Sequence, residues 1–447
     1  MKWQKSTAIA VTAALTTAAL AGCAGGTPSA GGDVELNYWL WDSNQQSGYQ
    51  ECATAFTEAN PNIDVTVTQY GWDDYWNGIT TGLVSGTAPD VFTDHAAFFP
   101  TFVEKSQILP IDDAVESEGI DLDAYQPGLT DLWVGADGKR YGLPKDIGLV
   151  ALFANADKLA EAGVDPTSLE SLDWNPSDGG SYEALIAHLT VDKNGVRGDE
   201  AGFDKAAVAT YGLGLNGAGD GSGETIWAQY ALSNGWGYYD GDAAAPEFRY
   251  DDPKFLDAIA WFHSLSEKGY MPTLQIATSG IGQQDNYGAG NYAMVTEGSW
   301  SAGGYFGLSD VTTVLAPLPE GPEGRQSTAN SLGDSIAATT KHPEEAKKLL
   351  AFFGSDACQS LIAQGGVIIP AIADQAEASK ATFEAAGIDI QPFLQIAEDG
   401  GTHTTPVVAQ WPDAMAIFKP TMEAYLGGSG DIDSFVDANE QINALYN

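Results

Sequence analysis

Aromatic rings and carboxylates are the side chains of this sequence that could act on a small molecule. The chain of 447 residues contains 12 Trp, 18 Tyr and 17 Phe, together with 61 Asp and Glu. Aromatic faces pack on the C–H groups of sugar rings, and polar side chains pair with the hydroxyls. Glycoside hydrolysis, in contrast, needs only two well-placed carboxylates. The composition therefore favours a carbohydrate site and leaves binding and hydrolysis open.

Motifs for other chemistry are absent from the sequence. It contains no GxSxG, HExxH or GxxxxGK[ST] segment, and its five His are scattered. Residues 212–217 fit GxGxxG by letter, but a further Gly-rich stretch follows instead of a helix. We therefore expect no metal and no cofactor. Cys52 and Cys358 form no metal-ligand pattern, and either a disulfide or two separate buried thiols fits them.

The first residues have the pattern of an export signal. Two lysines precede an uncharged apolar run over residues 8–20, which is too short to span a membrane. Two small residues then stand before Cys23, and this resembles the lipobox of bacterial lipoproteins. The resemblance implies a signal peptide over 1–22 and a lipidated, flexible tether over 23–33. The alternative is an ordinary secretory signal that is cut elsewhere.

The charge of the chain limits its partners. The formal net charge is −42 at pH 7. Such a surface repels phosphate backbones and anionic lipid, so we expect no nucleic-acid partner. A neutral ligand fits this charge best, and a cationic ligand is the alternative.

Alternating strand and helix patterns predict an α/β fold. Residues 34–41, 63–69 and 91–93 have strand patterns, and apolar residues at helical spacing occupy 49–56 and 72–83 between them. A β-α-β-α-β order favours a parallel sheet with crossover helices. The length of the folded part suggests two or three structural units.

Four segments, in order, resemble the family 1 extracellular solute-binding proteins, which are the sugar-binding components of ABC importers of the maltodextrin-binding type. They are SGTAPDV at 85–91, YGLPKD at 141–146, AMVTEGSW at 293–300 and HPEEA at 342–346. The resemblance implies two discontinuous lobes around a ligand cleft, joined by two or three crossing segments. We expect 34–147 and 330–355 in one lobe, and 148–329 and 356–447 in the other.

The same resemblance implies ligand contacts and partners. Matched positions that are candidates for the cleft are Trp41, Asp42, Asp94, His95, Lys145, Asp146, Trp227, Trp236, Trp300 and Trp411. Trp72 joins them because it begins a predicted helix. For each ring the alternative is core packing, and for the pair at 145–146 it is a hinge ion pair.

The family works without chemistry on its ligand, beside a membrane permease. We therefore expect a monomeric binder, not an enzyme, held by Cys23 at the outer face of a single-membrane, Gram-positive type of cell. The alternatives are a surface glycoside hydrolase with a carboxylate pair, and a binder of peptides or cationic solutes.

Overall fold

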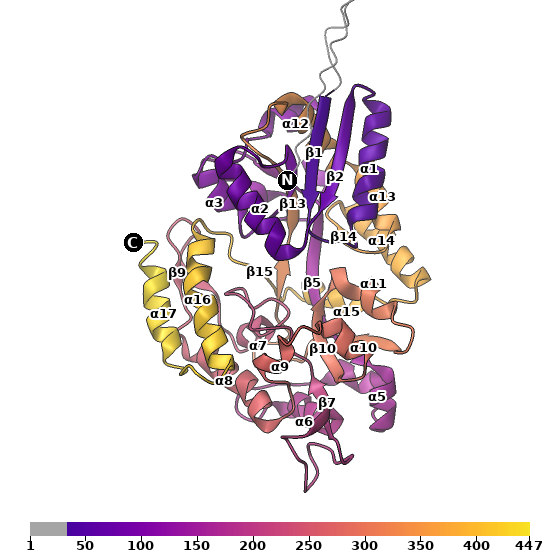
Figure 1. Cartoon of the computed structure of the whole chain (residues 1–447), viewed down its shortest axis with the longest axis vertical. Coiled ribbons are helices and arrows are strands. Elements are labelled where there is room, and N and C mark those ends of the chain that lie inside the picture. Colours follow the sequence, from indigo (N-terminus) through magenta and orange to yellow (C-terminus); the bar gives the residue numbers. More distant parts are fainter. Residues whose placement is uncertain (1–33) are drawn as a thin grey trace, which may run out of the picture.

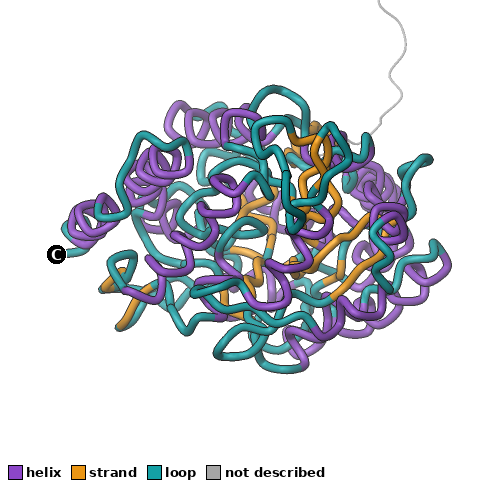
Figure 2. Tube along the Cα trace, turned by 90° about the horizontal axis from the view of Figure 1, so that it is seen from below, coloured by secondary structure: helices purple, strands orange, loops and turns teal. Residues whose placement is uncertain are grey.

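Two β-sheets, each covered by helices, lie one above the other in the computed structural model, which describes residues 34–447 (Figure 1). The predictions of a signal peptide, of lipidation at Cys23 and of a tether lie outside the described residues. Apart from a short ribbon at the edge of the view, the strands lie towards the middle of the molecule, and helices and loops surround them (Figure 2). No helix within 34–447 combines the length and the apolar character that a membrane crossing requires. The two-lobed α/β fold that the sequence predicts is confirmed.

The first sheet contains the predicted β-α-β-α-β unit. Its strands, in spatial order, are β2 (Ile63–Gln69), β1 (Val34–Leu40), β3 (Val91–His95), β13 (Leu332–Ile336) and β4 (Gly142–Pro144). β1 pairs in parallel with β2 and β3, whereas β13 is antiparallel to both of its neighbours. The parallel pairs require crossover helices, which are α1 (Gln46–Ala59) and α2 (Trp72–Ser85). α2 ends at Gly86, whose left-handed φ of 79° suits glycine.

The second sheet is built around β5 (Asp146–Asn155). Its strands, in order, are β15 (Thr402–Thr404), β12 (Ser327–Asn330), β5, β10 (Tyr292–Gly298), β7 (Val208–Leu213) and β6 (Val191–Asp192), and β11 (Thr313–Ala316) and β14 (Ile369–Pro370) also pair with β5. Residues 149–154 of β5 are all buried. This continuous apolar run fits a strand that is covered on both faces. A separate two-stranded ribbon joins β8 (Tyr239–Asp240) to β9 (Glu247–Phe248).

Further helices cover the two sheets. They are α3 (Phe99–Glu104), α4 (Asp112–Ser117), α5 (Ala156–Glu161), α6 (Gly180–Leu189), α7 (Ala228–Ser233), α8 (Pro253–Lys268), α9 (Leu274–Ala277), α10 (Gln283–Gly288), α11 (Ala302–Phe306), α12 (Pro343–Phe353), α13 (Asp356–Gln364), α14 (Ala373–Ala385), α15 (Gln391–Glu398), α16 (Trp411–Leu426) and α17 (Ser434–Asn443). We call the first sheet with its helices the first lobe, and the second sheet with its helices the second lobe.

Three crossing segments join the lobes. The chain passes from β4 to β5 at Lys145, from β12 to β13 at Ser331, and from α13 to α14 through 365–372. Backbone hydrogen bonds hold these segments together: the Lys145 N–H donates to the Leu332 carbonyl at 2.8 Å, and the Ala371 N–H donates to the Lys145 carbonyl at 3.1 Å. The two lobes therefore meet at one bonded hinge.

A disulfide joins Cys52 of α1 to Cys358 of α13, across 306 residues of sequence. Of the two alternatives that the sequence left open, the structure has the disulfide. α13 also packs its buried Ile362 into the apolar cluster of the first sheet. This helix therefore lies with the first lobe, although the sequence-based boundary at 355 places it in the second. The apolar face of α13 and the bond to α1 account for the difference.

Removal of the disulfide should destabilise the protein. A disulfide that closes a long loop restricts the unfolded chain, and typical stabilisation is about 2–4 kcal/mol. We expect Cys52→Ala/Cys358→Ala to lower the free energy of unfolding by that amount in urea titrations. Dithiothreitol should have the same effect on the unmodified protein and none on the double variant. Equal stability of the two proteins would contradict the expectation.

Candidate functional site

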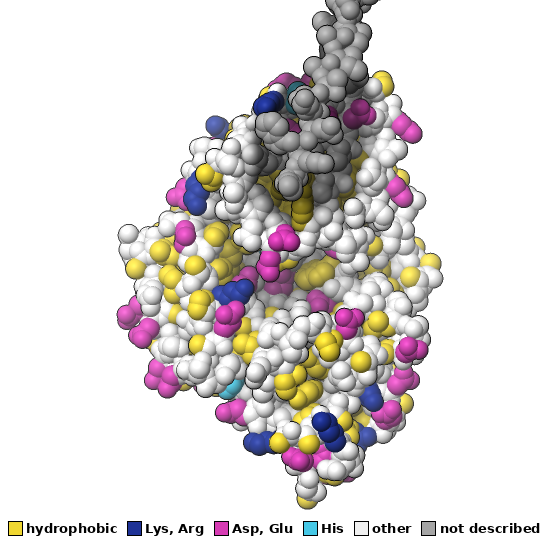
Figure 3. Space-filling model, viewed as in Figure 1, with side chains coloured by type: hydrophobic (Ala, Val, Ile, Leu, Met, Phe, Trp, Pro, Cys, Tyr) yellow, Lys and Arg dark blue, Asp and Glu magenta, His cyan; other side chains and the backbone are white. Residues whose placement is uncertain are grey.

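A cavity of about 500 Å³ lies between the lobes, over the crossing segments. The space-filling view shows the face hollowed between the upper and lower halves of the molecule (Figure 3). The lining residues are Trp41, Asp42, Ser43, Asn44, Gln45, Trp72, His95, Asp146, Ile147, Gly148, Asn216, Glu224, Ser299, Trp300, Ser301, Asn330, Leu332 and Ile368. Both lobes contribute to this lining, and so do residues directly beside the first two crossing points and Ile368 of the third crossing segment.

The structure brings six of the sequence-predicted site residues together in this cavity. They are Trp41, Asp42, Trp72, His95, Asp146 and Trp300. Trp41 directly follows β1, and His95 is the last residue of β3. Because β1 and β3 are parallel, their carboxyl ends meet at one edge of the sheet, which is where α/β folds bind ligands. The order of strands thus positions the first-lobe side of the cavity.

Two tryptophan rings form an aromatic corner on the first lobe. The rings of Trp41 and Trp72 meet edge to face, with centroids 5.2 Å apart and an interplanar angle of 90°. Trp76 supports Trp41 from behind, at 5.3 Å. The Trp72 ring is accessible to solvent, since 47% of this residue is exposed. The corner presents apolar ring surface to whatever enters the cavity.

A third ring, that of Trp300, lies on the second-lobe side. It packs directly on the backbone of Gly148 and Gly298. A Cβ atom at either glycine would come within 2.6 Å and 2.2 Å, respectively, of the indole ring. Only glycine therefore permits this position of the ring at the cavity wall.

Three carboxyl groups face the cavity among these rings. Asp42 accepts hydrogen bonds from the Asn44 N–H at 2.9 Å and from the Gln45 amide at 3.0 Å. Asp146 is only 4% exposed, and its Oδ1 accepts from the Leu332 N–H at 3.1 Å. Burial raises the pKa of Asp42, that of Asp146 to about 7 and that of Glu224 to about 8. Partial desolvation makes these groups strong partners for hydroxyl groups.

His95 offers a hydrogen-bond donor to the cavity. Its Nδ1 accepts from the Ala97 N–H at 3.1 Å, so the ring proton is on Nε2. Burial lowers the pKa of His95 to about 4, and the ring is therefore neutral near pH 7. No Lys or Arg is among the residues that line this cavity. The site thus combines a neutral imidazole donor with carboxyl groups that can accept hydrogen bonds and, when protonated, donate them.

Lys145 does not line the cavity, contrary to the sequence-based expectation. Its ammonium group is buried beneath the hinge, where it donates to Thr93 Oγ1 at 2.8 Å and to the Tyr38 hydroxyl at 3.2 Å. Asp334 Oδ1 lies 3.9 Å away, and the centroid of the Tyr49 ring also lies 3.9 Å away. Burial lowers the pKa of Lys145, and the negative charge of Asp334 opposes that shift. Lys145 is therefore part of an ion pair at the hinge, which was the alternative to a ligand contact, and its partner is Asp334.

Asp94 is also buried below the cavity wall and does not line it. Its Oδ1 accepts from the His95 N–H at 2.8 Å, and burial raises its pKa to about 8. The strand β3 continues through Asp94, so this side chain points to the face opposite to that of its neighbour. The expectation that Asp94 contributes to the cleft is therefore wrong.

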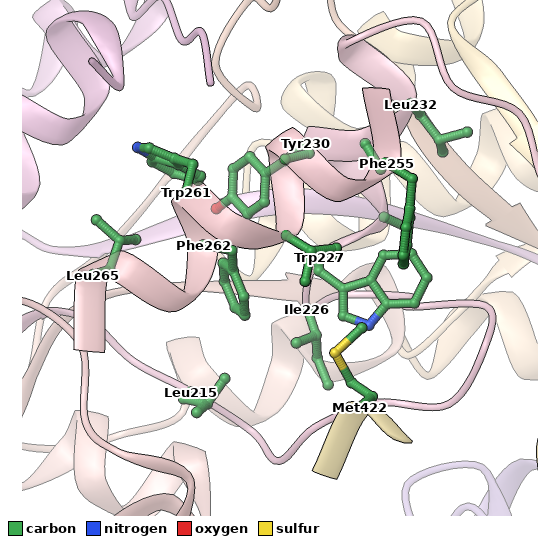
Figure 4. Close-up of a cluster of buried hydrophobic side chains, with 14 of the residues drawn as sticks. Leu215, Ile226, Trp227, Tyr230, Leu232, Phe255, Trp261, Phe262, Leu265 and Met422 are labelled. Carbon is green, nitrogen blue, oxygen red and sulfur yellow. The ribbon is translucent and has the colours of Figure 1, made fainter. Parts of the chain in front are cut away.

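Three predicted rings belong to the core of the second lobe instead. Trp227 is fully buried between Phe255 and Phe418, and Figure 4 shows it among apolar side chains that include Met422 of α16. Trp236 donates its Nε1–H to the Arg249 carbonyl at 2.7 Å. The third ring, that of Trp411, stacks on Phe248. Side chains of α7, α8 and α16 fill this region. The prediction that these three rings line the cleft is therefore wrong, and they are core residues.

Sequence reasoning missed several polar lining residues. They are Ser43, Asn44, Gln45, Asn216, Glu224, Ser299, Ser301 and Asn330. The first three directly follow Asp42, so the loop after the first strand carried a usable signal. Asn216 and Glu224 bound a Gly-rich stretch with no periodicity, and nothing in their local pattern distinguishes them from surface residues. Within residues 34–447, no cluster of three His, Cys, Asp or Glu side chains is arranged to hold a metal ion.

Comparison with known proteins identifies the family. A sequence model of the bacterial extracellular solute-binding proteins matches residues 51–388. This chain belongs to that family.

Curated relatives match parts or the whole of the chain. An arabinooligosaccharide-binding protein of Halalkalibacterium halodurans is 29% identical over 146 residues, which cover 32% of each chain. A lactose-binding protein of Rhizobium radiobacter is 30% identical over 171 residues, which cover 37% of this chain and 38% of that protein. The chain thus spans about a third of the length of these two relatives. A putative binding protein of Brucella abortus is 22% identical and is matched over 93% of both chains.

Solved structures match nearly the entire described fold. UspC of M. tuberculosis superposes with a TM-score of 0.69 at 26% identity, over 92% of this chain and 100% of that one. An ABC substrate-binding protein of Listeria monocytogenes, in complex with cycloalternan, gives a TM-score of 0.79 at 19% identity, over 92% and 99%. The second likeness shows the fold alone.

Breaking the buried ion pair at Lys145 should destabilise the protein strongly. Removal of one partner of such a pair leaves an uncompensated buried charge and costs about 3–5 kcal/mol. We expect Lys145→Met to lower the free energy of unfolding by this amount, and Lys145→Met/Asp334→Leu to recover a large part of it. Urea denaturation measures both.

A matched control uses an exposed pair. Lys139 and Asp137 lie 3.7 Å apart at the surface, and exposed pairs contribute only about 0–1 kcal/mol. Lys139→Met should therefore have little effect. If Lys145→Met lowers the free energy of unfolding as little as this control does, the buried pair does not stabilise the protein.

Proposed function

We propose that this protein captures a neutral sugar or oligosaccharide in the cavity between its lobes and delivers it to the permease of an ABC importer. The observation that carries the proposal is the composition of the cavity wall. Rings of Trp41, Trp72 and Trp300 supply apolar faces, and carboxyl and amide groups stand between them. Sugar rings present this combination of C–H faces and hydroxyl edges. The protein works as a monomer, without a cofactor.

The comparisons support binding over hydrolysis. The family consists of solute-binding proteins, and two relatives are named for the arabinooligosaccharides and lactose that they bind. The glycoside hydrolase alternative receives no support from them. The absence of Lys and Arg from the cavity wall disfavours anionic solutes, because nothing there would compensate their charge.

Ligand capture would proceed by closure about the hinge. Trp41 and Asp42 contact the ligand from the first lobe, whereas Trp300 contacts it from the second. A ligand that touches both lobes binds the closed form better than the open form, so it shifts the population toward closure. The permease then has a distinct surface to recognise.

A thermal-shift screen against mono- and oligosaccharides tests the proposal. A ligand that binds only the folded state stabilises it by about 2.7 kcal/mol at a hundredfold excess over Kd, so a bound sugar raises the melting temperature. Trp300→Ala should weaken binding about tenfold, which corresponds to the loss of one aromatic contact. Tyr239→Ala, on the β8–β9 ribbon outside the cavity, is the control and should bind normally. Failure of every sugar, with a shift by a peptide or polyamine, would contradict the carbohydrate assignment.

Chromatography of the incubated oligosaccharides separates binding from hydrolysis. The binding function predicts that each oligosaccharide is recovered intact. Release of shorter sugars at enzymatic rates would instead establish the hydrolase.

For the location of the protein we propose the outer face of the cell membrane. The family is extracellular. The residues before Cys23 resemble a lipobox, and acyl chains on this cysteine would hold the protein beside its permease. Lipidation contributes about 0.8 kcal/mol per buried CH₂, so more than one chain gives durable anchoring. A cell with a single membrane needs such an anchor, since no outer membrane confines its binding proteins.

Replacement of Cys23 tests the anchor. In the cell of origin, Cys23→Ala should move the protein from the membrane fraction into the medium, as measured by immunoblotting of both fractions. Ser29→Ala, in the same segment, is the control and should stay with the membrane. Retention of Cys23→Ala in the membrane fraction would show that another feature holds the protein there.

A further inference from the structure

Gln359 of α13 is a buried amide that joins two of the crossing segments. Its Nε2 donates to the Pro144 carbonyl at 3.1 Å, and its Oε1 accepts from the Ile372 N–H at 2.8 Å. Pro144 ends β4 directly before the first crossing point, and Ile372 is the last residue of the third segment. The exposed fraction of Gln359 is 0%, so bulk water does not compete for these bonds. We call this pair of hydrogen bonds the Gln359 clamp.

The clamp extends the pairing of the backbone between the two segments. β14 pairs with β5 in an antiparallel register that places Pro370 opposite Asp146. The same register places Ile372 opposite Pro144, and Gln359 bonds to both residues. A side-chain amide carries a donor and an acceptor, as a peptide group does. The clamp therefore connects the last pair of this register.

The clamp is fixed to the first lobe by its own helix. Cys358 directly precedes Gln359 and is bonded to Cys52 of α1, and Figure 1 shows α13 beside α1. Ile362 of the same helix packs into the apolar cluster of the first sheet. The backbone that carries the amide is therefore held on two sides of the helix.

A second glutamine binds the same segment. The backbone N–H of Gln126 donates to the Ala371 carbonyl at 2.8 Å, and its Nε2 donates to the Pro370 carbonyl at 2.7 Å. Gln126 lies between α4 and β4, in the first lobe. Two glutamines of the first lobe thus hold residues 370–372.

The clamped segments carry residues of the cavity wall, whereas Gln359 does not touch the cavity. Asp146 lies two residues after Pro144, and Ile368 lies four residues before Ile372, and both line the cavity. Gln359 is not among the lining residues. The clamp therefore acts on the wall through the backbone of the crossing segments.

We propose that Gln359 is a positioning residue of the hinge, whose clamp holds the first and third crossing segments in the register from which the lobes close on a ligand. This inference rests on the proposed function and adds a residue outside the cavity that sets the affinity. Without the clamp, the segments adopt other separations, and the free protein spends less time in the geometry that binds. The apparent Kd rises in proportion as the competent fraction falls.

The separation of the lobes in the free protein tests the clamp without any ligand. Spin labels at Val84→Cys in α2 and Ala260→Cys in α8 report this distance by pulsed electron paramagnetic resonance. Both sites are exposed, and Cys23→Ala protein has no other free thiol, since its remaining cysteines form the disulfide. Gln359→Met keeps the length of the side chain and removes both bonds. We expect its distance distribution to be about twice as broad as that of the parent protein.

An equal width in Gln359→Met and the parent would overturn the inference. Should Gln359→Met fail to fold, Gln126→Met decides in its place. It removes only the bond to Pro370, from a side chain that is partly exposed, and it should also broaden the distribution. A distribution of parental width in Gln126→Met would then overturn the inference.

Calorimetry separates a role in binding from a role in stability alone. The probes are lactose, maltotriose and arabinotriose, titrated into the full protein. For a probe that binds, Gln359→Met should raise the Kd about tenfold, as expected if a tenth of the molecules stay competent. An unchanged Kd would overturn the inference. If none of the probes binds, the result counts against the proposed function, and the distance distributions alone decide on the clamp.

Asn443→Leu is the matched control. The amide of Asn443 in α17 also bonds one backbone N–H and one carbonyl, both of Phe248, at 2.7 Å and 3.0 Å. These bonds lie outside the crossing segments, so their loss should change neither the distance distribution nor the Kd. Equal effects of Gln359→Met and Asn443→Leu on the Kd would reduce Gln359 to a purely structural residue and overturn the inference.

Discussion

The buried ammonium group of Lys145 is the interaction on which the arrangement of the site depends. It is held at the point where the chain leaves the first sheet, by groups from three other elements: Tyr38 of β1, Thr93 of β3 and Asp334 of β13. Such a charge is tolerated inside a protein only with good partners, so its presence fixes the relative position of these strands. The backbone of the same residue bonds to the other two crossing segments. One residue therefore connects the order of the first sheet to the hinge.

The charge pattern around the cavity follows from this placement. The ammonium group of Lys145 is buried beneath the hinge and does not line the cavity. The adjacent Asp146 lies at the cavity wall, and burial raises its pKa to about 7. Coulombic attraction to Lys145 opposes this rise. The carboxyl is thus held between its charged and neutral forms near pH 7, where it can accept a hydrogen bond or donate one. A hydroxyl group suits both states, because it is itself donor and acceptor.

The sequence predicted those parts of the site that lie at strand ends. Trp41, Asp42 and His95 follow or end parallel strands, so the β-α-β pattern alone brings them to one edge. Periodicity carries no comparable information about the three core tryptophans, because a ring that packs on α8 and one that faces a cavity have the same local sequence. Glu224 was missed for a related reason: a Gly-rich segment without a pattern positions it. The sequence-based boundary placed α13 in the second lobe because the disulfide that holds it on the first lobe joins cysteines 306 residues apart, and local patterns do not reveal such a pair.

The hinge and the binding cavity are the same region of the molecule. Asp146 directly after the first crossing point, Leu332 beside the second and Ile368 from the third segment all line the cavity. The disulfide and the apolar face of α13 hold the start of the third segment on the first lobe. With the proposed function, a ligand in the cavity would therefore contact residues beside the hinge. Direct contact would then couple binding to the proposed closure, without a longer pathway through either lobe.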